Sequence, residues 1–161
     1  MQQIQIRLID KNDNKVLASI IRNALKEFGA NKPGTVYFDD STDKLFELFQ
    51  QAKSAYHVAI INNEVVGGGG IFYTPGLDED TCELVKLYLS PASRGLGVGK
   101  LLMKQCLHTA KELGFKKVYL ETMPELTSAI PMYEKFGFTY LKTPMGNSGH
   151  GGCDIWMLKE L

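Results

Sequence analysis

The sequence has few cysteines, no net charge and no long hydrophobic run, and each absence excludes a class of protein. The three cysteines, Cys82, Cys106 and Cys153, are odd in number and far apart, so they indicate neither a disulfide framework nor a zinc site. No metal is expected. Lys and Arg together number 18, as do Asp and Glu. This balance argues against general binding to nucleic acid or to an anionic membrane.

Targeting and linker segments are also absent. Residues 1–15, MQQIQIRLIDKNDNK, are too polar for a signal peptide. No segment approaches the roughly 20 apolar residues that a membrane-spanning helix needs. A cytoplasmic location without membrane association is therefore expected. Since no linker, repeat or low-complexity stretch divides the 161 residues, we expect one domain over 1–161.

Hydrophobic periodicity predicts a regular succession of strands and helices. The expected strands are 4–9, 56–61, 64–73, 82–89, 116–122, 138–143 and 153–161. The expected helices are 16–28, 45–52, 100–113 and 129–136. The order βααββ followed by βαβαββ predicts an α/β fold of the mixed α+β kind. Its central, mostly antiparallel sheet of about seven strands would be flanked by about four helices. The run Gly67–Gly70 indicates either a bulge or a close approach of substrate, or else a floppy hairpin edge.

A glycine-rich loop precedes the longest predicted helix, in the segment LSPASRGLGVGKLL at 89–102. The start of a helix offers unpaired N–H groups and a favourable dipole to an anion. Two phosphate-binding motifs do not fit. A P-loop needs glycine where Arg94 stands and Ser or Thr where Leu101 stands. A dinucleotide-binding fingerprint needs glycine at position 100, which is lysine.

The pattern Arg-x-x-Gly-x-Gly, formed by Arg94, Gly97 and Gly99, resembles the pyrophosphate loop of the GNAT acetyltransferase superfamily. ELVKLYLSP at 83–91 is similar to that family's fourth strand, and AIPMYEKFGF at 129–138 to its Ala-x-x-x-Tyr-x-x-x-Gly-Phe helix. The element order is also that of the family's fold, so the resemblance covers nearly the whole chain.

The C-terminal stretch MGNSGHGGCDIWML, at 145–158, is similar to a subgroup of this superfamily. That subgroup includes acetyltransferases fused to MarR-type regulators. We expect no such DNA-binding domain in this chain, because it has no room for one.

The resemblance implies an acyltransferase that moves an acetyl group from acetyl-coenzyme A to an amine, by direct attack in a ternary complex. Backbone N–H groups would hold the pyrophosphate, and Lys100 or Arg94 would add charge; a solvated Lys100 is the alternative. The residues expected at the phosphates are Arg94, Gly95, Leu96, Gly97, Val98, Gly99 and Lys100. Those expected along the pantetheine arm are Leu87, Tyr88 and Leu89.

Acetyl transfer to an amine also needs a general base for the amine and a general acid for the departing sulfur. Glu83 matches a position that some family members use as general base, and we expect it on one strand face with Val85, Leu87 and Leu89. On such an apolar face its pKa would be raised, whereas a strand-end glutamate in water is the alternative. His150, in a glycine-rich loop, is the competing base.

Tyr133 matches the family's general acid, which lies near the coenzyme sulfur. One departure from the family pattern is Leu126, which stands where many members have a coenzyme-contacting asparagine.

The acceptor is less well defined. The small size and the C-terminal loop favour a small-molecule amine, with a protein or peptide amine as the alternative. A non-catalytic acyl-coenzyme A sensor is a third hypothesis, which the presence of both Glu83 and Tyr133 disfavours. Dimers are common among similar proteins, and this analogy alone suggests a homodimer; the sequence leaves the oligomeric state open.

Overall fold

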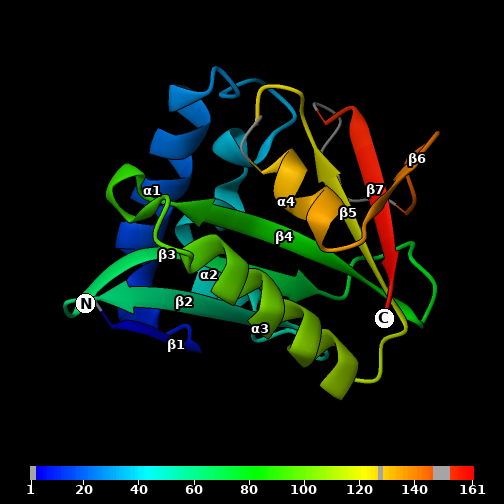
Figure 1. Ribbon diagram of the computed structural model, residues 1–161, viewed down its shortest axis with the longest axis horizontal. Helices are drawn as coiled ribbons and strands as arrows, with labels where there is room; N and C mark the ends of the chain where they lie inside the picture. The colour runs from blue at the N-terminus through cyan, green and yellow to red at the C-terminus, as the bar shows by residue number, and fades with distance from the viewer. Residues whose placement is uncertain (1–2, 127–128, 147–152) are drawn as a thin grey trace.

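A seven-stranded sheet forms the centre of this computed structural model, which describes residues 3–126, 129–146 and 153–161 (Figure 1). The strands are β1 Ile4–Leu8, β2 Ala55–Ile61, β3 Glu64–Phe72, β4 Thr81–Leu89, β5 Lys117–Thr122, β6 Thr139–Leu141 and β7 Ile155–Glu160. The α-helices in these ranges are α1 Asn14–Glu27, α2 Leu45–Leu48, α3 Val98–Glu112 and α4 Ile130–Lys135. The predicted order of strands and helices is confirmed.

The strands lie in the order β1-β2-β3-β4-β5-β7-β6. Only the β4–β5 pair is parallel among the strand pairs of the described residues. The predicted β2–β3 hairpin turns at Asn62 and Asn63, whose φ angles are 52° and 65°. Asparagine tolerates this left-handed backbone better than most residues, as a two-residue hairpin turn requires.

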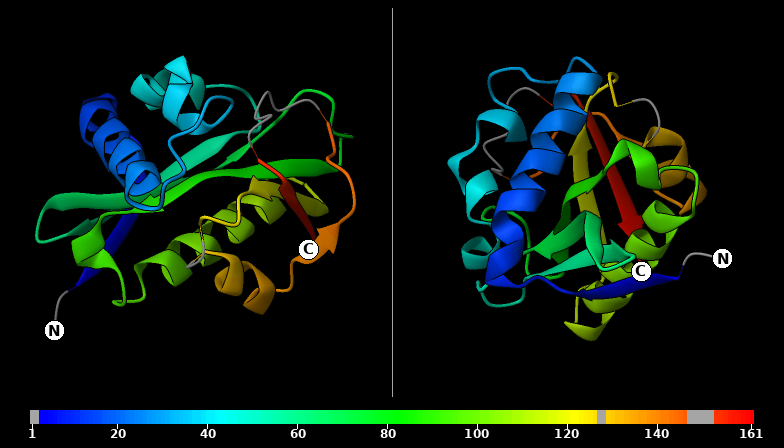
Figure 2. Two further views of the ribbon diagram at one scale, coloured as in Figure 1. Left: turned by 90° about the horizontal axis from the view of Figure 1, so that it is seen from above. Right: turned by 90° about the vertical axis from the view of Figure 1, so that its left-hand side faces the viewer.

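Helices cover both faces of the sheet: α1 and α2 lie on one side, and α3 and α4 on the other (Figure 2). Leu17, Ile21 and Leu25 of α1 form one core cluster with Tyr56 and Val58 of β2. The second large cluster contains Met103, Cys106 and Ala110 of α3 together with Leu120 and Tyr133. Burying an apolar side chain of this size stabilises a fold by about 1.5–3 kcal/mol. No helix within the described ranges is long and apolar enough to cross a membrane.

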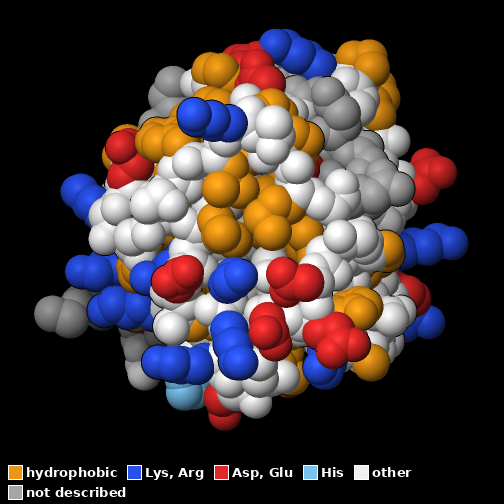
Figure 3. Space-filling view, turned by 90° about the vertical axis from the view of Figure 1, so that its right-hand side faces the viewer, with side chains coloured by type: hydrophobic (Ala, Val, Ile, Leu, Met, Phe, Trp, Pro, Cys, Tyr) orange, Lys and Arg blue, Asp and Glu red, His pale blue; other side chains and the backbone are white. Residues whose placement is uncertain are grey.

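The face that carries β6 and β7 has hydrophobic side chains at its centre, with positive and negative side chains next to one another below them (Figure 3). Tyr140 of β6 is among the exposed aromatic residues. The interleaved charges on this face agree with the balanced composition of the chain.

The glycine run lies in β3, between β2 and β4, and not at an edge of the sheet. A Cβ atom at Gly68 or Gly70 would stand 2.5 or 2.7 Å from the Tyr56 ring, and one at Gly69 would stand 2.7 Å from Leu87 Cδ1. Real side chains do not pack this closely. The run therefore makes room for the protein's own side chains on both sheet faces. The predicted bulge is present as a register shift against β4 between Gly68 and Gly70, and the floppy-edge interpretation is wrong.

A β-bulge at Lys86 interrupts β4. Gly68 pairs with Tyr88 but Gly70 pairs with Val85, so β4 holds one residue more than β3 over this stretch. Lys86 has a φ of 54°, unusual for a residue with a side chain. Because a one-residue insertion reverses the alternation, Val85 packs in the α1 cluster and Leu87 in the α3 cluster. The predicted shared face for Glu83, Val85, Leu87 and Leu89 is therefore wrong.

Helix α2 is also shorter than the predicted 45–52, since it ends at Leu48. Phe49 follows as the C-cap, and its ring contacts those of Tyr56 and Phe72 at centroid distances of 5.0 and 5.5 Å. Two short 3-10 helices, Val36–Phe38 and Asp40–Asp43, occupy much of the segment before α2. Aromatic packing against the sheet thus replaces further helical turns.

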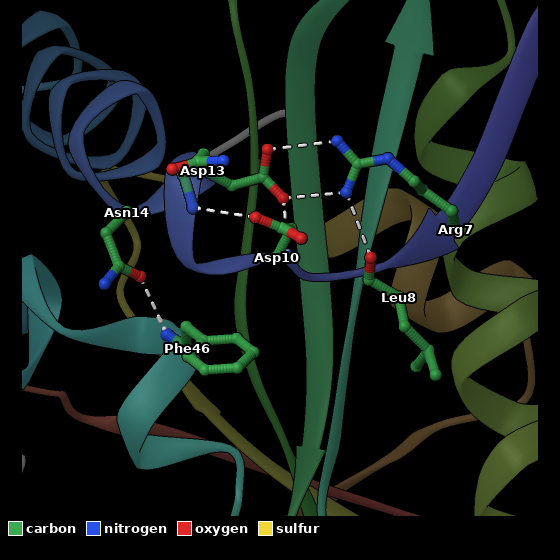
Figure 4. Close-up of polar contacts among 7 residues, drawn as sticks. Arg7, Leu8, Asp10, Asp13, Asn14 and Phe46 are labelled. Atoms are coloured by element: carbon green, nitrogen blue, oxygen red, sulfur yellow. Dashed lines mark hydrogen bonds and ion pairs between the residues drawn. The ribbon is translucent and has the colours of Figure 1, made fainter.

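Polar contacts hold the start of α1 to its neighbours (Figure 4). The Arg7 guanidinium on β1 donates to both Asp13 carboxylate oxygens, at 2.7 and 3.0 Å. The Phe46 N–H of α2 donates to the Asn14 side chain at 2.8 Å. These contacts fix the N-terminal end of α1 relative to β1 and α2.

Candidate active site

A gap between β4 and β5 forms the site. The two strands pair only where Thr81–Glu83 lies beside Lys117–Tyr119, and beyond these residues they diverge (Figure 1). The gap belongs to a cavity of about 340 Å³ whose wall includes β4, the end of β5, α4 and the end of α1.

The glycine loop lies at one end of this cavity. Gly97 is the N-cap of α3, and Gly95 and Gly97 have φ angles of 80° and 85°, which glycine adopts without strain. No side chain of the described residues caps this helix start. The N–H groups of its first turn lack partners within the helix and can meet an anion.

Most of the predicted phosphate-binding residues line the cavity: Arg94, Gly95, Gly97, Val98, Gly99 and Lys100. Leu96 is an exception, since it is 47% exposed and does not belong to the described cavity wall. The left-handed residues on either side of Leu96 turn it outward from the loop.

Arg94 braces the loop against α1. Its guanidinium donates to the Leu89 carbonyl at 3.1 Å, pairs with Glu27 and lies 5.0 Å from the centre of the Phe28 ring. Arg94 thus has structural partners on two elements while it lines the cavity. Lys100, in contrast, is exposed in the first turn of α3.

The predicted pantetheine-binding residues Leu87, Tyr88 and Leu89 all line the cavity. On one edge, Tyr88 and Leu89 pair with Gly68 and Gly67 of β3. On the other edge the pairing with β5 has already ended. Backbone groups on that edge can therefore pair with a ligand in the gap, as an added strand would.

Tyr133 lines the cavity from α4 and is 7% exposed. Burial raises the pKa of its phenol, so the hydroxyl keeps its proton at neutral pH. The ring packs edge-on against Phe138 at a centroid distance of 6.0 Å. Pro131 stands in the first helical turn, where its missing N–H has no cost.

Glu83 is 2% exposed and lines the same cavity. Burial raises the pKa of its carboxyl to about 7, and the neighbouring Glu121 acts in the same direction. The Thr74 hydroxyl, which donates to Glu83 at 2.6 Å, and the Lys86 ammonium oppose this rise. The alternative of a strand-end glutamate in water is therefore wrong. His150 lies outside the described residues.

Sequence reasoning missed three further polar residues near Glu83. The Tyr119 hydroxyl donates to Glu121 at 2.6 Å and accepts from the Met145 N–H at 3.0 Å. The Lys86 side chain is 3% exposed, and its ammonium nitrogen lies 3.6 Å from Asp39. Burial lowers the Lys86 pKa, which Asp39 partly offsets. The lysine within the otherwise apolar stretch LVKLYL was the available signal.

Comparison with known proteins agrees with this fold and identifies the family. Residues 19–138 match the model of the acetyltransferase (GNAT) family. The uncharacterized N-acetyltransferase YjgM of Escherichia coli is 41% identical over 158 residues, which cover 97% of this chain and 94% of that protein. The chain therefore belongs to the GNAT acetyltransferase family. Membership makes it an acyltransferase, and acetyl-coenzyme A is the donor of that family.

Solved structures show the same fold. A GNAT-family acetyltransferase of Staphylococcus aureus superposes with a TM-score of 0.86 at 22% identity, covering 98% of this chain and 99% of that one. The PaiA N-acetyltransferase of Thermoplasma acidophilum, crystallised with coenzyme A, gives 0.77 at 20% identity, covering 99% of each chain. The similarity to the MarR-fused subgroup stays a prediction.

Proposed function

We propose that this protein is an acetyl-coenzyme A-dependent N-acetyltransferase that acts on a primary amine of a small molecule, by direct attack in a ternary complex. The observation that carries the proposal is the single cavity that joins the start of α3, the free edge of β4, Tyr133 and the buried Glu83. Acetyl-coenzyme A would supply the thioester from which the acetyl group is transferred.

The described residues fit the donor. Gly95 and Gly97 leave open space beside the loop, since a Cβ atom at either position would meet nothing within 4 Å. The first-turn N–H groups of α3 are available to the pyrophosphate. The free edge of β4 at Leu87, Tyr88 and Leu89 can pair with the amides of the pantetheine arm.

Two side chains would move protons. Glu83 accepts a proton from the attacking amine nitrogen, since a carboxyl with a pKa of about 7 is partly ionised at neutral pH and still basic. Tyr133 donates its hydroxyl proton to the departing sulfur. The C–N bond forms as the C–S bond breaks, so the products are an amide and free coenzyme A. Thr74 orients Glu83 through their 2.6 Å hydrogen bond.

Burial around Glu83 supports a small acceptor. Thr35, which follows α1, and Glu83 both line the cavity and are almost completely buried. An extended peptide needs an open groove with backbone partners, whereas a compact amine fits a closed pocket. We therefore favour a small molecule over a protein N-terminus or lysine.

The proposal is tested by measuring binding and turnover separately. Calorimetry with acetyl-coenzyme A tests the donor site, and release of free thiol is then followed with a panel of small amines and peptides. We expect donor binding and thiol release with at least one small primary amine. Turnover of peptides alone would make the acceptor a polypeptide, and binding without turnover would indicate a sensor. Absence of donor binding would overturn the proposal.

A further inference from the structure

Thr122 carries an unexplained buried polar atom. It is the last residue of β5 and is 2% exposed. Within the described ranges, its Oγ1 is the one buried side-chain nitrogen or oxygen without a hydrogen-bond partner. Such atoms are rare in native proteins because their loss of water is not compensated. A ligand that supplies the missing partner would explain why this position holds a hydroxyl.

The position of Thr122 narrows the choice of ligand. Thr122 lines the cavity, and on its other edge β5 pairs it with Ile155 of β7. Pairing between β5 and β4 ended at Tyr119, so the opposite edge of Thr122 borders the gap. A group bound between the two diverging strands is therefore the available partner.

Alternation along β5 identifies the face on which the hydroxyl lies. Leu120, two residues earlier, packs in the α3–α4 cluster with Tyr133, and Thr122 shares its face. Met123 packs in the α1 cluster, as expected for the opposite face. Thr122 thus faces the same side of the sheet as Tyr133 and the glycine loop, where the donor is proposed to bind.

We propose that the Thr122 hydroxyl is a coenzyme-binding group that hydrogen-bonds an amide of the pantetheine arm where the arm occupies the gap between β4 and β5. A hydroxyl can donate to the amide carbonyl or accept from the amide N–H. The assignment rests on the proposed function, because it requires coenzyme in this cavity. It adds a side-chain contact from β5 to the backbone contacts expected from β4.

The variant Thr122→Val tests this assignment, since valine keeps the shape and removes the hydroxyl. Calorimetry should show about three- to tenfold weaker binding of both coenzyme A and acetyl-coenzyme A, as for the loss of one net hydrogen bond. Thr122→Ser should bind both as the wild type does. Without coenzyme, Thr122→Val should melt at the wild-type temperature or above it, because an unpaired buried hydroxyl has been removed.

Thr81→Val is the matched control. Thr81 is also fully buried, but its hydroxyl donates to Asp78 at 2.8 Å and it does not belong to the described cavity wall. This variant should melt at a lower temperature and bind both coenzymes normally.

Three outcomes for Thr122→Val would overturn the assignment. They are unchanged affinity, a loss confined to acetyl-coenzyme A (which would place the partner on the thioester) and a lowered melting temperature without coenzyme. If the wild type bound neither coenzyme, the proposed function would fail, and this assignment with it. That result is distinct, because it appears before any variant is measured.

Discussion

At the glycine loop and on the α3–α4 side of the gap, the cavity wall consists of backbone, glycines and uncharged side chains together with Arg94 and Lys100, whereas on the α1 side it carries Glu83, Lys86 and Glu121. The first wall is built for a ligand held by N–H groups of a helix start and a strand edge. The second contains ionisable groups whose pKa values burial has shifted. In the proposed function, donor binding and proton transfer would therefore depend on different physical properties of one cavity.

The two walls of the cavity should respond differently to pH. Backbone dipoles do not titrate, so donor binding should be insensitive to pH near neutrality. The Glu83 carboxyl titrates at about pH 7, so turnover should respond there. Substitutions in the α1-side wall should change turnover, and those in the glycine loop should change donor affinity.

The largest effect is expected for Glu83→Gln. The amide keeps the shape and cannot accept the amine proton, so turnover should fall by roughly 10²- to 10⁴-fold, as for loss of a general base. Coenzyme affinity measured by calorimetry should be unchanged. Glu64→Gln, at an exposed position of β3, is the control and should retain wild-type turnover. Full turnover in Glu83→Gln would transfer the base role to another residue.

A smaller loss is expected for Tyr133→Phe. A thiol has a pKa of about 8.5, so a departing thiolate needs less help from an acid than a stronger base would. Turnover should fall by about 10²-fold, the lower end for acid–base catalysis, with coenzyme affinity retained. Steady-state kinetics and calorimetry check the two quantities. Wild-type turnover would remove the acid role from Tyr133.

The pH dependence separates the two walls. Because burial raises the Glu83 pKa to about 7, its carboxyl is protonated below that pH and cannot act as a base. The ratio of wild-type to Glu83→Gln kcat/KM should fall about tenfold for each unit below pH 7. Coenzyme affinity should stay constant between about pH 6 and 8. A parallel change of affinity and turnover with pH would contradict the separation.

The smallest effect concerns the loop. Gly97→Ala places a side chain at a φ of 85°, which costs about 1 kcal/mol at least and should weaken coenzyme binding about fivefold. Gly99→Ala is the matched control. Its Cβ would stand 3.4 Å from Leu89 and 3.5 Å from Met132, which are ordinary contacts, at a position without a left-handed φ. Equal effects of the two substitutions would show that space, not backbone conformation, governs the loop.

Local patterns predicted the fold better than they predicted details within its elements. The strand and helix order depends on neighbouring residues, and the structure confirms it, although α3 begins at Val98, two residues before the predicted start at Lys100. The length of α2 was wrong because Phe49 packs against residues distant in sequence. The β4 alternation was wrong because nothing in LVKLYL signals a bulge at Lys86.

The candidate site likewise contains features that local sequence predicts and features that depend on residues distant in sequence. The residues predicted to bind phosphate lie together along the cavity because one short segment supplies them all, apart from Leu96, and their role in binding stays a prediction. The surroundings of Glu83 could not be predicted. Its hydrogen-bond partner Thr74 precedes it by nine residues, whereas Glu121 lies on another strand. Thr122 had no distinguishing signal, since its unpaired hydroxyl exists only as a result of packing.

Periodicity predicted the order of the elements, and the resemblance of three segments to GNAT motifs, the loop with Arg94, Gly97 and Gly99 among them, indicated the family that the comparisons show. The element order and the motifs depend on backbone preferences and on contacts between residues close in sequence, so short segments determine them. Folding alone buried Glu83, placed Lys86 beside Asp39 and left Thr122 at an open strand edge. Burial and electrostatic surroundings depend on which distant segments meet, and here β4 and β5 meet and then separate.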